Sequence, residues 1–418
     1  MASYGRLLRS PGVLRIMLAQ LTARLPNGML SLAYLLHVEG VFHSYGAAGI
    51  VLATTSVGQA IAGPLLGRWM GAWGMRPVLA LTTAVSAATM LTIAFAPMSL
   101  AGYAAVGFLG GLSLPPVQPA VRTIYPKIVN STQLTLLFSL DSSAQELIWI
   151  ASPVLITFVS VQVSTQLGIL LAVAFLVGGG AWFIASPELG KVRIPRSKRR
   201  FGLVLARPPV LLATVISILL IGCCAALEAS VVASFGDTGP QSGIVLAIWS
   251  VASLVGGLAF GDIPIGPTAL GRRMLVVTVG TVLAALAAGY FATEPDAAGQ
   301  FGSAQFWALA GTLAISGLGI APCMAVMFAI VSVSVRFSDT AEAYGWVGTG
   351  QLIGGAAGSA VTGFLIDAHG AAGGFAAGAA FAALGTLIAF ALRRAHPDLR
   401  GRDASPLPDT APVPLTPS

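Results

Sequence analysis

Twelve long apolar runs dominate this sequence, and each is long enough to cross a bilayer, which takes about 20 residues of helix. Hydrophobic residues make up 56% of the chain and charged residues only 9%, too few to cover a water-exposed surface. The runs are too continuously apolar for barrel strands, which alternate between two environments. A helix, in contrast, satisfies its own backbone hydrogen bonds in lipid. We therefore predict an all-α integral membrane protein whose twelve transmembrane helices cover residues 12–36, 46–67, 77–96, 99–121, 134–160, 164–186, 209–233, 240–262, 274–292, 303–335, 344–366 and 371–392.

The charges predict how these spans are oriented. Of the 22 basic residues, Arg15 and Arg24 fall in the first span, and the remaining 20 lie in the tails or the even-numbered connections. The odd-numbered connections hold acids instead, namely Glu39, Asp237, Glu294, Asp296 and Asp367. Because positive charge stays on the cytoplasmic side, we expect a multi-pass protein of the bacterial cytoplasmic membrane with both termini inside. The net charge of +7 then follows from topology and requires no nucleic-acid partner.

The spans divide into two sets of six. We expect an N-terminal half at 1–186, a basic cytoplasmic linker at 187–208 and a C-terminal half at 209–392. The proline-rich tail at 393–418 has no apolar periodicity and is expected to be disordered.

An internal repeat relates the two halves. Nine of 19 positions match without a gap between "GIVLATTSVGQAIAGPLLG", which starts at Gly49, and "GIVLAIWSVASLVGGLAFG", which starts at Gly243. Span 2 therefore corresponds to span 8. Both spans enter the membrane from the same side, so the halves are parallel repeats, a design that secondary transporters commonly use with the substrate site between the repeats.

The connection after span 2 reads "GRWMGAWGMRPVL" from Gly67. With the six-plus-six topology and the basic central loop, it resembles the major facilitator superfamily over about residues 10–392. Gly67, Gly74 and Arg76 match the loop pattern of that family, whereas Gly71 stands where an aspartate is usual. The resemblance implies two six-helix bundles that alternate access to a cavity lined by spans 1, 4, 7 and 10.

Within the superfamily, the chain looks like actinobacterial efflux-like members. Efflux-type relatives often carry an arginine in span 4. The run at 99–121 contains none, and Arg122 is counted in the cytoplasmic connection that follows.

Besides Arg15 near the start of the first span, four charged residues lie deeper inside spans, where a charge costs roughly 2.5–3.5 kcal/mol and is therefore a functional hypothesis. They are Arg24 in span 1, Asp141 and Glu146 in span 5, and Glu228 in span 7. Polar residues accompany them: Gln20, Asn27 and Ser31 form a stripe with Arg24 at helical spacing, Gln145 shares a face with Asp141, and Gln118 in span 4 is a further candidate to face the cavity.

Two interpretations of these charges stay open. In the first, Arg24 pairs with Glu146 or Asp141 and only locks the N-terminal half. In the second, the network binds substrate or relays protons. The coupling carboxyl would then be Glu228 or the acid of span 5 that Arg24 leaves unpaired.

The connection after span 2 also predicts a cytoplasmic gate. By resemblance, its usual acid faces the start of span 11, and that acid is missing here. Span 11 instead begins with Asp339 and Glu342, three residues apart. We predict that Arg68 or Arg76 meets one of these acids when the halves close. The alternative is that the two acids only cap the helix, as in a capping box.

The function predicted from the sequence is secondary active transport by alternating access. We expect an exporter of a small amphipathic or hydrophobic compound, with protons as the coupling ion. The alternative is a proton symporter that imports a small anionic or neutral metabolite. No nucleophile motif, metal-ligand cluster or nucleotide loop predicts an enzyme, a metal site or another cofactor. The expected partners are the small-molecule substrate and the lipid bilayer, and we expect a monomer.

Overall fold

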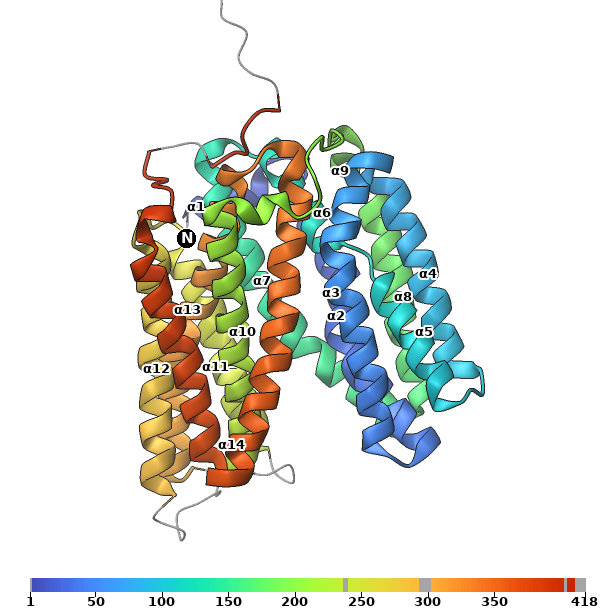
Figure 1. Cartoon of the computed structure of the whole chain (residues 1–418), viewed down its shortest axis with the longest axis vertical. Helices are drawn as coiled ribbons and strands as arrows, with labels where there is room; N and C mark the ends of the chain where they lie inside the picture. The colour runs from blue at the N-terminus through green and yellow to red at the C-terminus, as the bar shows by residue number, and fades with distance from the viewer. Residues whose placement is uncertain (1, 236–239, 293–301, 402–403, 410–418) are drawn as a thin grey trace, which may run out of the picture.

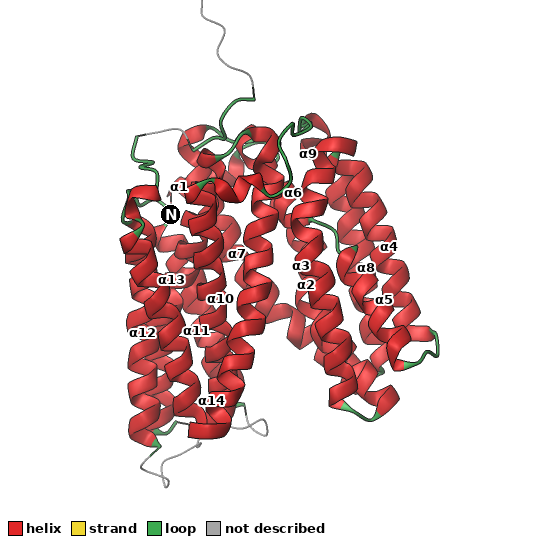
Figure 2. Ribbon diagram, viewed as in Figure 1, coloured by secondary structure: helices red, strands yellow, loops and turns green. Residues whose placement is uncertain are grey.

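The computed structural model describes residues 2–235, 240–292, 302–401 and 404–409. Of the acids assigned to the outer connections, Asp237, Glu294 and Asp296 lie outside these residues. Within the described ranges the chain is built of helices and loops (Figure 2). The N-terminal half contains α1 (Ala2–Arg9), α2 (Val13–Phe42), α3 (Tyr45–Trp73), α4 (Met75–Phe95), α5 (Leu100–Leu112), α6 (Val117–Ile124), α7 (Ser131–Gln162) and α8 (Thr165–Ala185). After α9 (Pro187–Lys191), the C-terminal half contains α10 (Pro208–Phe235), α11 (Gln241–Phe260), α12 (Ala269–Phe291), α13 (Ala304–Ser334) and α14 (Thr340–Ala391).

The helices account for the predicted spans. Ten helical stretches in the described part of the chain are long and apolar enough to cross a membrane. In addition, α2 corresponds to the first predicted span, and α14 contains the last two. The 52 residues of α14 include Gly370, whose φ of 66° and ψ of −165° are not helical. A left-handed φ favours glycine, and here it separates the two arms of α14.

Span 4 departs from the prediction in a way that matters for the site. Its helix stops at Leu112 and resumes at Val117, because Pro115 and Pro116 interrupt it. A proline lacks the backbone N–H and disfavours a helical conformation in the residue before it. The stretch Leu100–Lys127 nevertheless remains long and apolar enough to span a membrane, and Arg122 lies inside it, on α6. The assignment of Arg122 to a cytoplasmic connection was therefore wrong.

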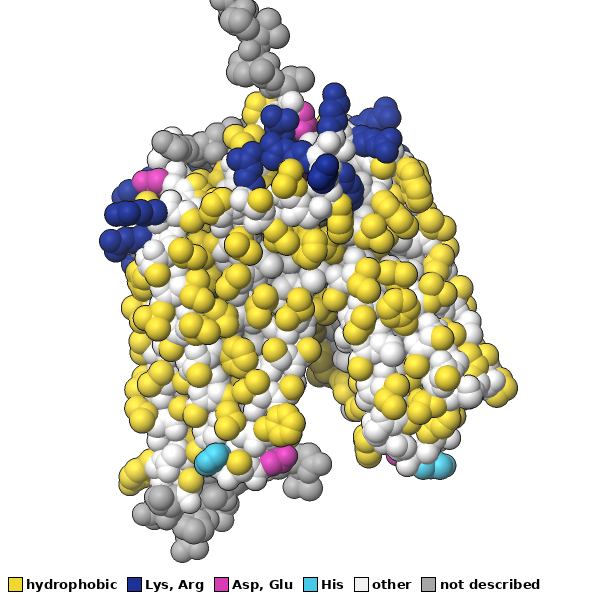
Figure 3. Space-filling view, viewed as in Figure 1, with side chains coloured by type: hydrophobic (Ala, Val, Ile, Leu, Met, Phe, Trp, Pro, Cys, Tyr) yellow, Lys and Arg dark blue, Asp and Glu magenta, His cyan; other side chains and the backbone are white. Residues whose placement is uncertain are grey.

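The two halves stand side by side and meet toward one end (Figure 1). In the space-filling view, lysine and arginine side chains gather at that end, which we call the basic face, and a cleft between the halves opens at the opposite end (Figure 3). The halves are joined where α3 packs on α14 and where α7 packs on α11 and α13. The structure is thus closed at the basic face and open at the other.

Glycines allow the halves to approach at backbone distance. A Cβ added to Gly67 of α3 would lie 2.4 Å from the carbonyl oxygen of Ala341 in α14. Gly63 of α3 also packs against the backbone of α14, at Gly345. Gly257 of α11, which the repeat aligns with Gly63, packs against the side chain of Ser143 in α7. Equivalent positions of the repeat therefore form the two junctions between the halves. The glycines of span 11 at Gly354 and Gly358 pack instead on α10, inside the C-terminal half.

Two described residues of the tail make backbone contacts with the C-terminal half. The amide of Leu399 donates to Ile265, 2.9 Å away. Leu407 bonds on both sides of Arg336: its amide donates to Val335 (2.9 Å), and its carbonyl accepts from Phe337 (3.0 Å). These contacts hold the described tail against the basic face of the C-terminal half.

Candidate functional site

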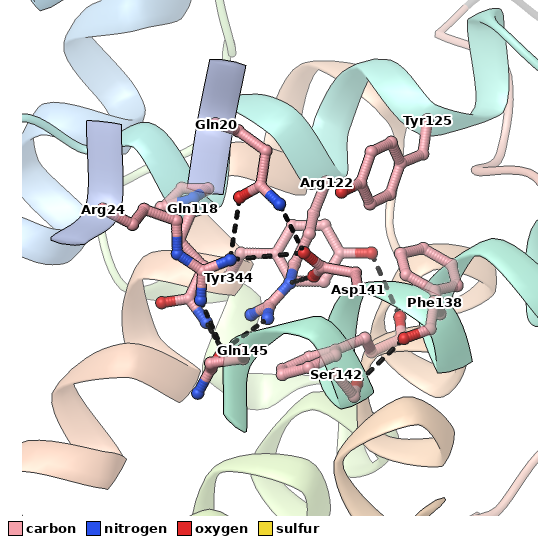
Figure 4. A network of polar contacts seen from close by, with 12 residues as sticks. Gln20, Arg24, Gln118, Arg122, Tyr125, Phe138, Asp141, Ser142, Gln145 and Tyr344 are labelled. Carbon is pink, nitrogen blue, oxygen red and sulfur yellow. Dashed lines mark hydrogen bonds and ion pairs between the residues drawn. The ribbon is translucent and has the colours of Figure 1, made fainter. Parts of the chain in front are cut away.

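A buried ion network lies where the halves meet (Figure 4). Asp141 of α7 is fully buried, with one carboxylate oxygen 3.2 Å from Nη1 of Arg24 on α2 and the other 2.8 Å from Nε of Arg122 on α6. Both arginines are also buried. A carboxylate held by two guanidinium groups needs no further counter-charge, so the network keeps three charges at membrane depth with a surplus of one positive charge.

Three glutamines complete this network. Gln20 accepts from Arg24 (2.9 Å) and donates to Asp141 (3.2 Å). The amide oxygen of Gln145 accepts from Arg24 and from Arg122, and Gln118 lies beside both Gln145 and Arg122. All of the polar atoms come from α2, α6 and α7, so the network is built within the N-terminal half.

Aromatic residues carry the contact across to the other half. The guanidinium carbon of Arg122 lies 3.3 Å from the centroid of the Phe328 ring on α13. Phe138 of α7 packs at 6.4 Å from Tyr344 of α14, whose hydroxyl donates to the carbonyl of Phe328. A buried cation over an aromatic face is attracted by the ring quadrupole. Arg122 therefore joins the ion network to the C-terminal half.

Arg122 was not predicted as a site residue, because the fourth span was expected to end at residue 121 and Arg122 to lie in the loop that follows. The signal that could have found it was the Pro-Pro pair, which breaks span 4 and lets a second helical segment continue toward the basic face.

The polar stripe on α2 has a buried part and an exposed part, which meet at the base of the cleft. Gln20 and Arg24 are buried, whereas Asn27 and Ser31, farther from the basic face, are exposed. All four side chains share one face of the helix. Asn27 and Ser31 therefore face the open cleft, and Gln20 and Arg24 lie where the cleft ends. The network therefore forms the floor of the cleft.

The other two acids do not belong to this network. Glu146 of α7 is buried and accepts a hydrogen bond from Ser253 of α11 (2.9 Å), whose hydroxyl accepts from the amide of Ala321 (3.2 Å). Glu228 of α10 lies close enough for its charge to interact with that of Glu146. It has protein on most sides, yet its side chain is exposed, as in the wall of a cleft. Neither acid has a basic ion-pair partner among the described residues, so the structure pairs Arg24 with Asp141 and not with Glu146.

The residues of the predicted gate lie at the basic face, but in an arrangement that differs in part from the expected one. Arg68 reaches Glu342 at 3.1 Å and also donates to the carbonyl of Arg199 in the linker. Glu342 accepts a second bond from the amide of Gly202, at 2.7 Å. Arg76 points elsewhere and donates to the carbonyl of Ser186 (3.2 Å), within its own half.

Asp339 bonds to the linker instead of to the loop after span 2. One of its oxygens accepts from Ser197 (2.5 Å), and the other lies 3.7 Å from Arg199. It makes no side-chain bond that caps α14, so the capping box expected as the alternative does not form. Gly74, with φ of 95°, turns the chain between α3 and α4 and contributes no charge. The linker is thus a third component of this contact, and it was not predicted from the sequence.

The described residues contain no group of three or more histidine, cysteine or acidic side chains that could hold a metal ion. The cysteines at 223, 224 and 323 are buried and unpaired. What the site offers is a paired ion network, two acids at the junction of the halves, and a cleft that is open on one side.

Comparisons with known proteins agree with this architecture. The family model described as the Major Facilitator Superfamily matches residues 16–263 and 224–417. A bacterial homologue of the iron transporter ferroportin, in its outward-facing state, superposes with a TM-score of 0.70 at 12% identity, covering 91% of this chain and 98% of that one. The E. coli fucose:proton symporter FucP gives 0.68 at 16% identity, covering 92% and 99%. The human organic anion transporter MFSD10 gives 0.66 at 16% identity, covering 90% and 98%.

A search of curated proteins found no match. At these identities the solved structures show the fold alone, whereas the family model covers well over half of the chain in a single match. The chain therefore belongs to the major facilitator superfamily, and it is a multi-pass membrane transporter.

Proposed function

We propose that the protein is a proton-coupled exporter of a small amphipathic or hydrophobic compound, with its basic face toward the cytoplasm. The orientation is supported by the concentration of basic residues on that face. The observation that carries the coupling is the placement of Glu146 and Glu228: two acids from opposite halves interact across the junction that must change when access alternates.

The physical argument concerns uncompensated charge. Two carboxylates that lie within electrostatic reach of each other, neither with a basic ion-pair partner, repel when both are ionised. A proton, or a cationic group of the substrate, would relieve this repulsion. In the present open state, Glu228 is exposed to the cleft while Glu146 is held by Ser253, so a proton that enters from the open side meets Glu228 first.

The arginine network has a different role in this proposal. Asp141 is already compensated by Arg24 and Arg122, so it is not available as a proton carrier. In this proposal the network closes the floor of the cleft and contacts Phe328 through Arg122. Arg122 and Phe328 must separate before the basic face opens.

One observation favours the alternative, a proton symporter for a small anionic metabolite. The network holds two arginines against a single aspartate, and the surplus positive charge lies at the floor of the cleft, below Asn27. A carboxylate or phosphate on the substrate would be attracted there. Among the structural neighbours, one is a fucose:proton symporter and another an organic anion transporter, and both activities are compatible with this fold.

A thermal-shift screen of the purified protein against drugs, amino acids, sugars and organic acids would provide a ligand. Proteoliposomes that contain a pH-sensitive dye then report proton movement when that ligand is added. Antiport moves protons against the substrate flux, and symport moves them with it, so the sign of the pH change separates the two candidates.

The coupling residues are tested with Glu228→Gln and Glu146→Gln. We expect Glu228→Gln to abolish proton-driven transport while substrate exchange without a proton gradient continues. Asp367→Asn, which removes an exposed acid at the opposite face, is the matched control and keeps full coupling. If both glutamine variants couple as well as the wild type, the two acids have no part in the mechanism.

A further inference from the structure

A second site lies on the basic face, away from the junction of the halves. The beginning of α12 and the segment that follows α14 enclose a pocket of about 540 Å³. Its charged lining consists of Arg272, Arg393, Arg394, His396, Asp398 and Arg400. In Figure 3, dark blue side chains gather over the basic ends of α12 and α14, with an acid among them.

The pocket carries a surplus of positive charge. The single acid in its lining, Asp398, forms an ion pair with Arg400, at 2.6 Å. Arg272 donates only to the hydroxyl of Thr268, which is neutral. Arg393 and Arg394 have no ion-pair partner among the described residues. Three of the four arginines therefore direct their charge at one concave surface without a counter-ion.

A buried histidine gives independent evidence for a ligand. His396 is only 4% exposed, and its Nδ1 lies 2.7 Å from the carbonyl of Pro397, so Nδ1 carries the proton. Its Nε2 is buried and has no hydrogen-bond partner within the described structure. An unsatisfied buried nitrogen costs roughly 1–3 kcal/mol. The imidazole lines the pocket, and a group bound there would supply the missing partner.

We propose that this pocket binds a phosphate-bearing anion, whose oxygens are held by Arg393, Arg394 and Arg272 and whose remaining oxygen contacts Nε2 of His396. Guanidinium groups match phosphate oxygens in bidentate geometry. The position of the pocket relative to the membrane is compatible with two sources of the phosphate group. Since α14 ends at Ala391 and α12 begins at Ala269, the arginines lie where the apolar spans end, at the level of lipid headgroups, and they also face the water beyond. A phosphodiester of an anionic lipid and a free phosphate share the recognised chemistry.

The site would also connect the tail to the transporter body. His396, Asp398 and Arg400 belong to the tail, whereas Arg272 lies in the first turn of α12. The amide of Leu399 already bonds to Ile265 in the connection before α12. A bound phosphate would add charged contacts to that backbone bond and hold this part of the tail more firmly.

Binding should strengthen as the pH falls. Burial lowers the pKa of the His396 imidazole below its usual 6.5, and Arg273 adds to the decrease, while the hydrogen bond to Pro397 and the charge of Asp398 oppose it. A phosphate beside Nε2 favours the protonated ring, which donates to it, so the complex takes up a proton and is favoured in acid.

The experiment measures binding to the full-length protein after delipidation in neutral detergent. Native mass spectrometry with added phosphatidylglycerol, and with phosphatidylcholine for comparison, tests the lipid source. Thermal shift with inorganic phosphate tests the free anion. The double variant Arg393→Ala with Arg394→Ala removes two pocket charges, and Arg6→Ala with Arg9→Ala removes two exposed charges of α1 on the same face as the matched control.

We expect at least tenfold weaker binding of phosphatidylglycerol, of inorganic phosphate, or of both in the pocket variant, and wild-type binding in the control. Which probe responds identifies the source. Equal binding by the pocket variant and the control, with both probes, would overturn the proposal.

His396→Gln keeps the arginines and provides a second test should the double variant fail to fold. In the wild type, binding at pH 5.5 should exceed binding at pH 7.5, and the variant should lose this pH dependence while it retains most of the affinity at pH 7.5. An unchanged pH dependence would contradict the role of the imidazole.

Discussion

The guanidinium carbon of Arg122 lies 3.3 Å from the centroid of the Phe328 ring, and the two residues belong to opposite halves of the transporter. Arg122 also holds Asp141, which in turn holds Arg24. The buried ions of the N-terminal half are thereby joined to the C-terminal half by one aromatic ring. When the basic face opens, this contact must break, and Arg122 must exchange it for water or substrate.

The first prediction concerns Phe328→Leu, which keeps an apolar side chain but removes the ring. A desolvated cation–π contact is worth about 2 kcal/mol, so we expect the equilibrium to move by roughly tenfold or more away from the state closed at the basic face. Spin labels at Tyr45→Cys and Phe364→Cys, exposed positions in opposite halves, report the width of the cleft. The three native cysteines are buried and should not label.

The matched control is Phe306→Leu, on the same helix, because Phe306 packs against Phe235 inside the C-terminal half. The label distance should shorten in Phe328→Leu and stay at its wild-type value in the control. Equal distances in the two variants would mean that the ring does not hold the halves together.

The second prediction concerns the approach of α3 to α14. In Gly67→Ala, the added methyl would lie 2.4 Å from the carbonyl oxygen of Ala341, closer than two such atoms can stand. We expect the basic face to be forced open and transport to fall at least tenfold. Gly49→Ala adds the same methyl to α3 where nothing lies within 4 Å, and it should transport normally. Normal activity of Gly67→Ala would show that the junction adapts.

A third prediction separates the two arginines of the loop after span 2. Arg68 bonds to Glu342 of the other half, whereas Arg76 bonds to Ser186 of its own half. Hydrogen bonds to charged groups are worth about 1.5–3 kcal/mol. Arg68→Ala should therefore narrow the cleft measured by the same label pair, and Arg76→Ala should not.

The exchange of charges in Arg68→Glu with Glu342→Arg is expected to restore closure only in part. The reason is that the amide of Gly202 donates to the Glu342 carboxylate, and an arginine at that position cannot accept this bond. Complete rescue would indicate that the linker contributes little to the gate.

The fourth prediction concerns the tail. Leu407 makes two backbone hydrogen bonds, one with Val335 and one with Phe337, in the segment that leads to the gate residue Asp339. Truncation after residue 401 removes both bonds, each worth about 1 kcal/mol, so amide exchange at Phe337 should accelerate by roughly tenfold. Truncation after 409 leaves these bonds in place and serves as the control. Hydrogen-exchange mass spectrometry of the segment between α13 and α14 makes the measurement, and equal exchange in both truncations would show that the tail does not order this segment.

Several elements of the structure were predictable because they depend on local composition. The spans followed from runs of apolar residues, since a helix in lipid needs nothing beyond its own backbone bonds. The ends of the broken fourth span were less predictable, because the Pro-Pro pair interrupts the helix without interrupting the apolar run. Arg122 was consequently placed on the wrong side of a boundary.

The sequence predicted most of the charged residues of the candidate site, but it did not predict which of them pair with each other. Arg24, Asp141, Glu146 and Glu228 stood out because an ionised side chain within an apolar run is costly. Spacing alone could not decide between Asp141 and Glu146 as the partner of Arg24, since both lie on α7 and either could face α2.

By itself, the sequence determined that the chain crosses the membrane repeatedly and that its halves repeat each other, because hydropathy and residue spacing are properties of one segment at a time. Only the tertiary structure decided which charges meet. Arg122 meets the C-terminal half because α13 places Phe328 over its guanidinium group. Glu342 is satisfied because α3 brings Arg68, and the linker brings Gly202, to the start of α14. Those partners are far away along the chain, and their approach depends on the packing of both halves, which no local pattern encodes.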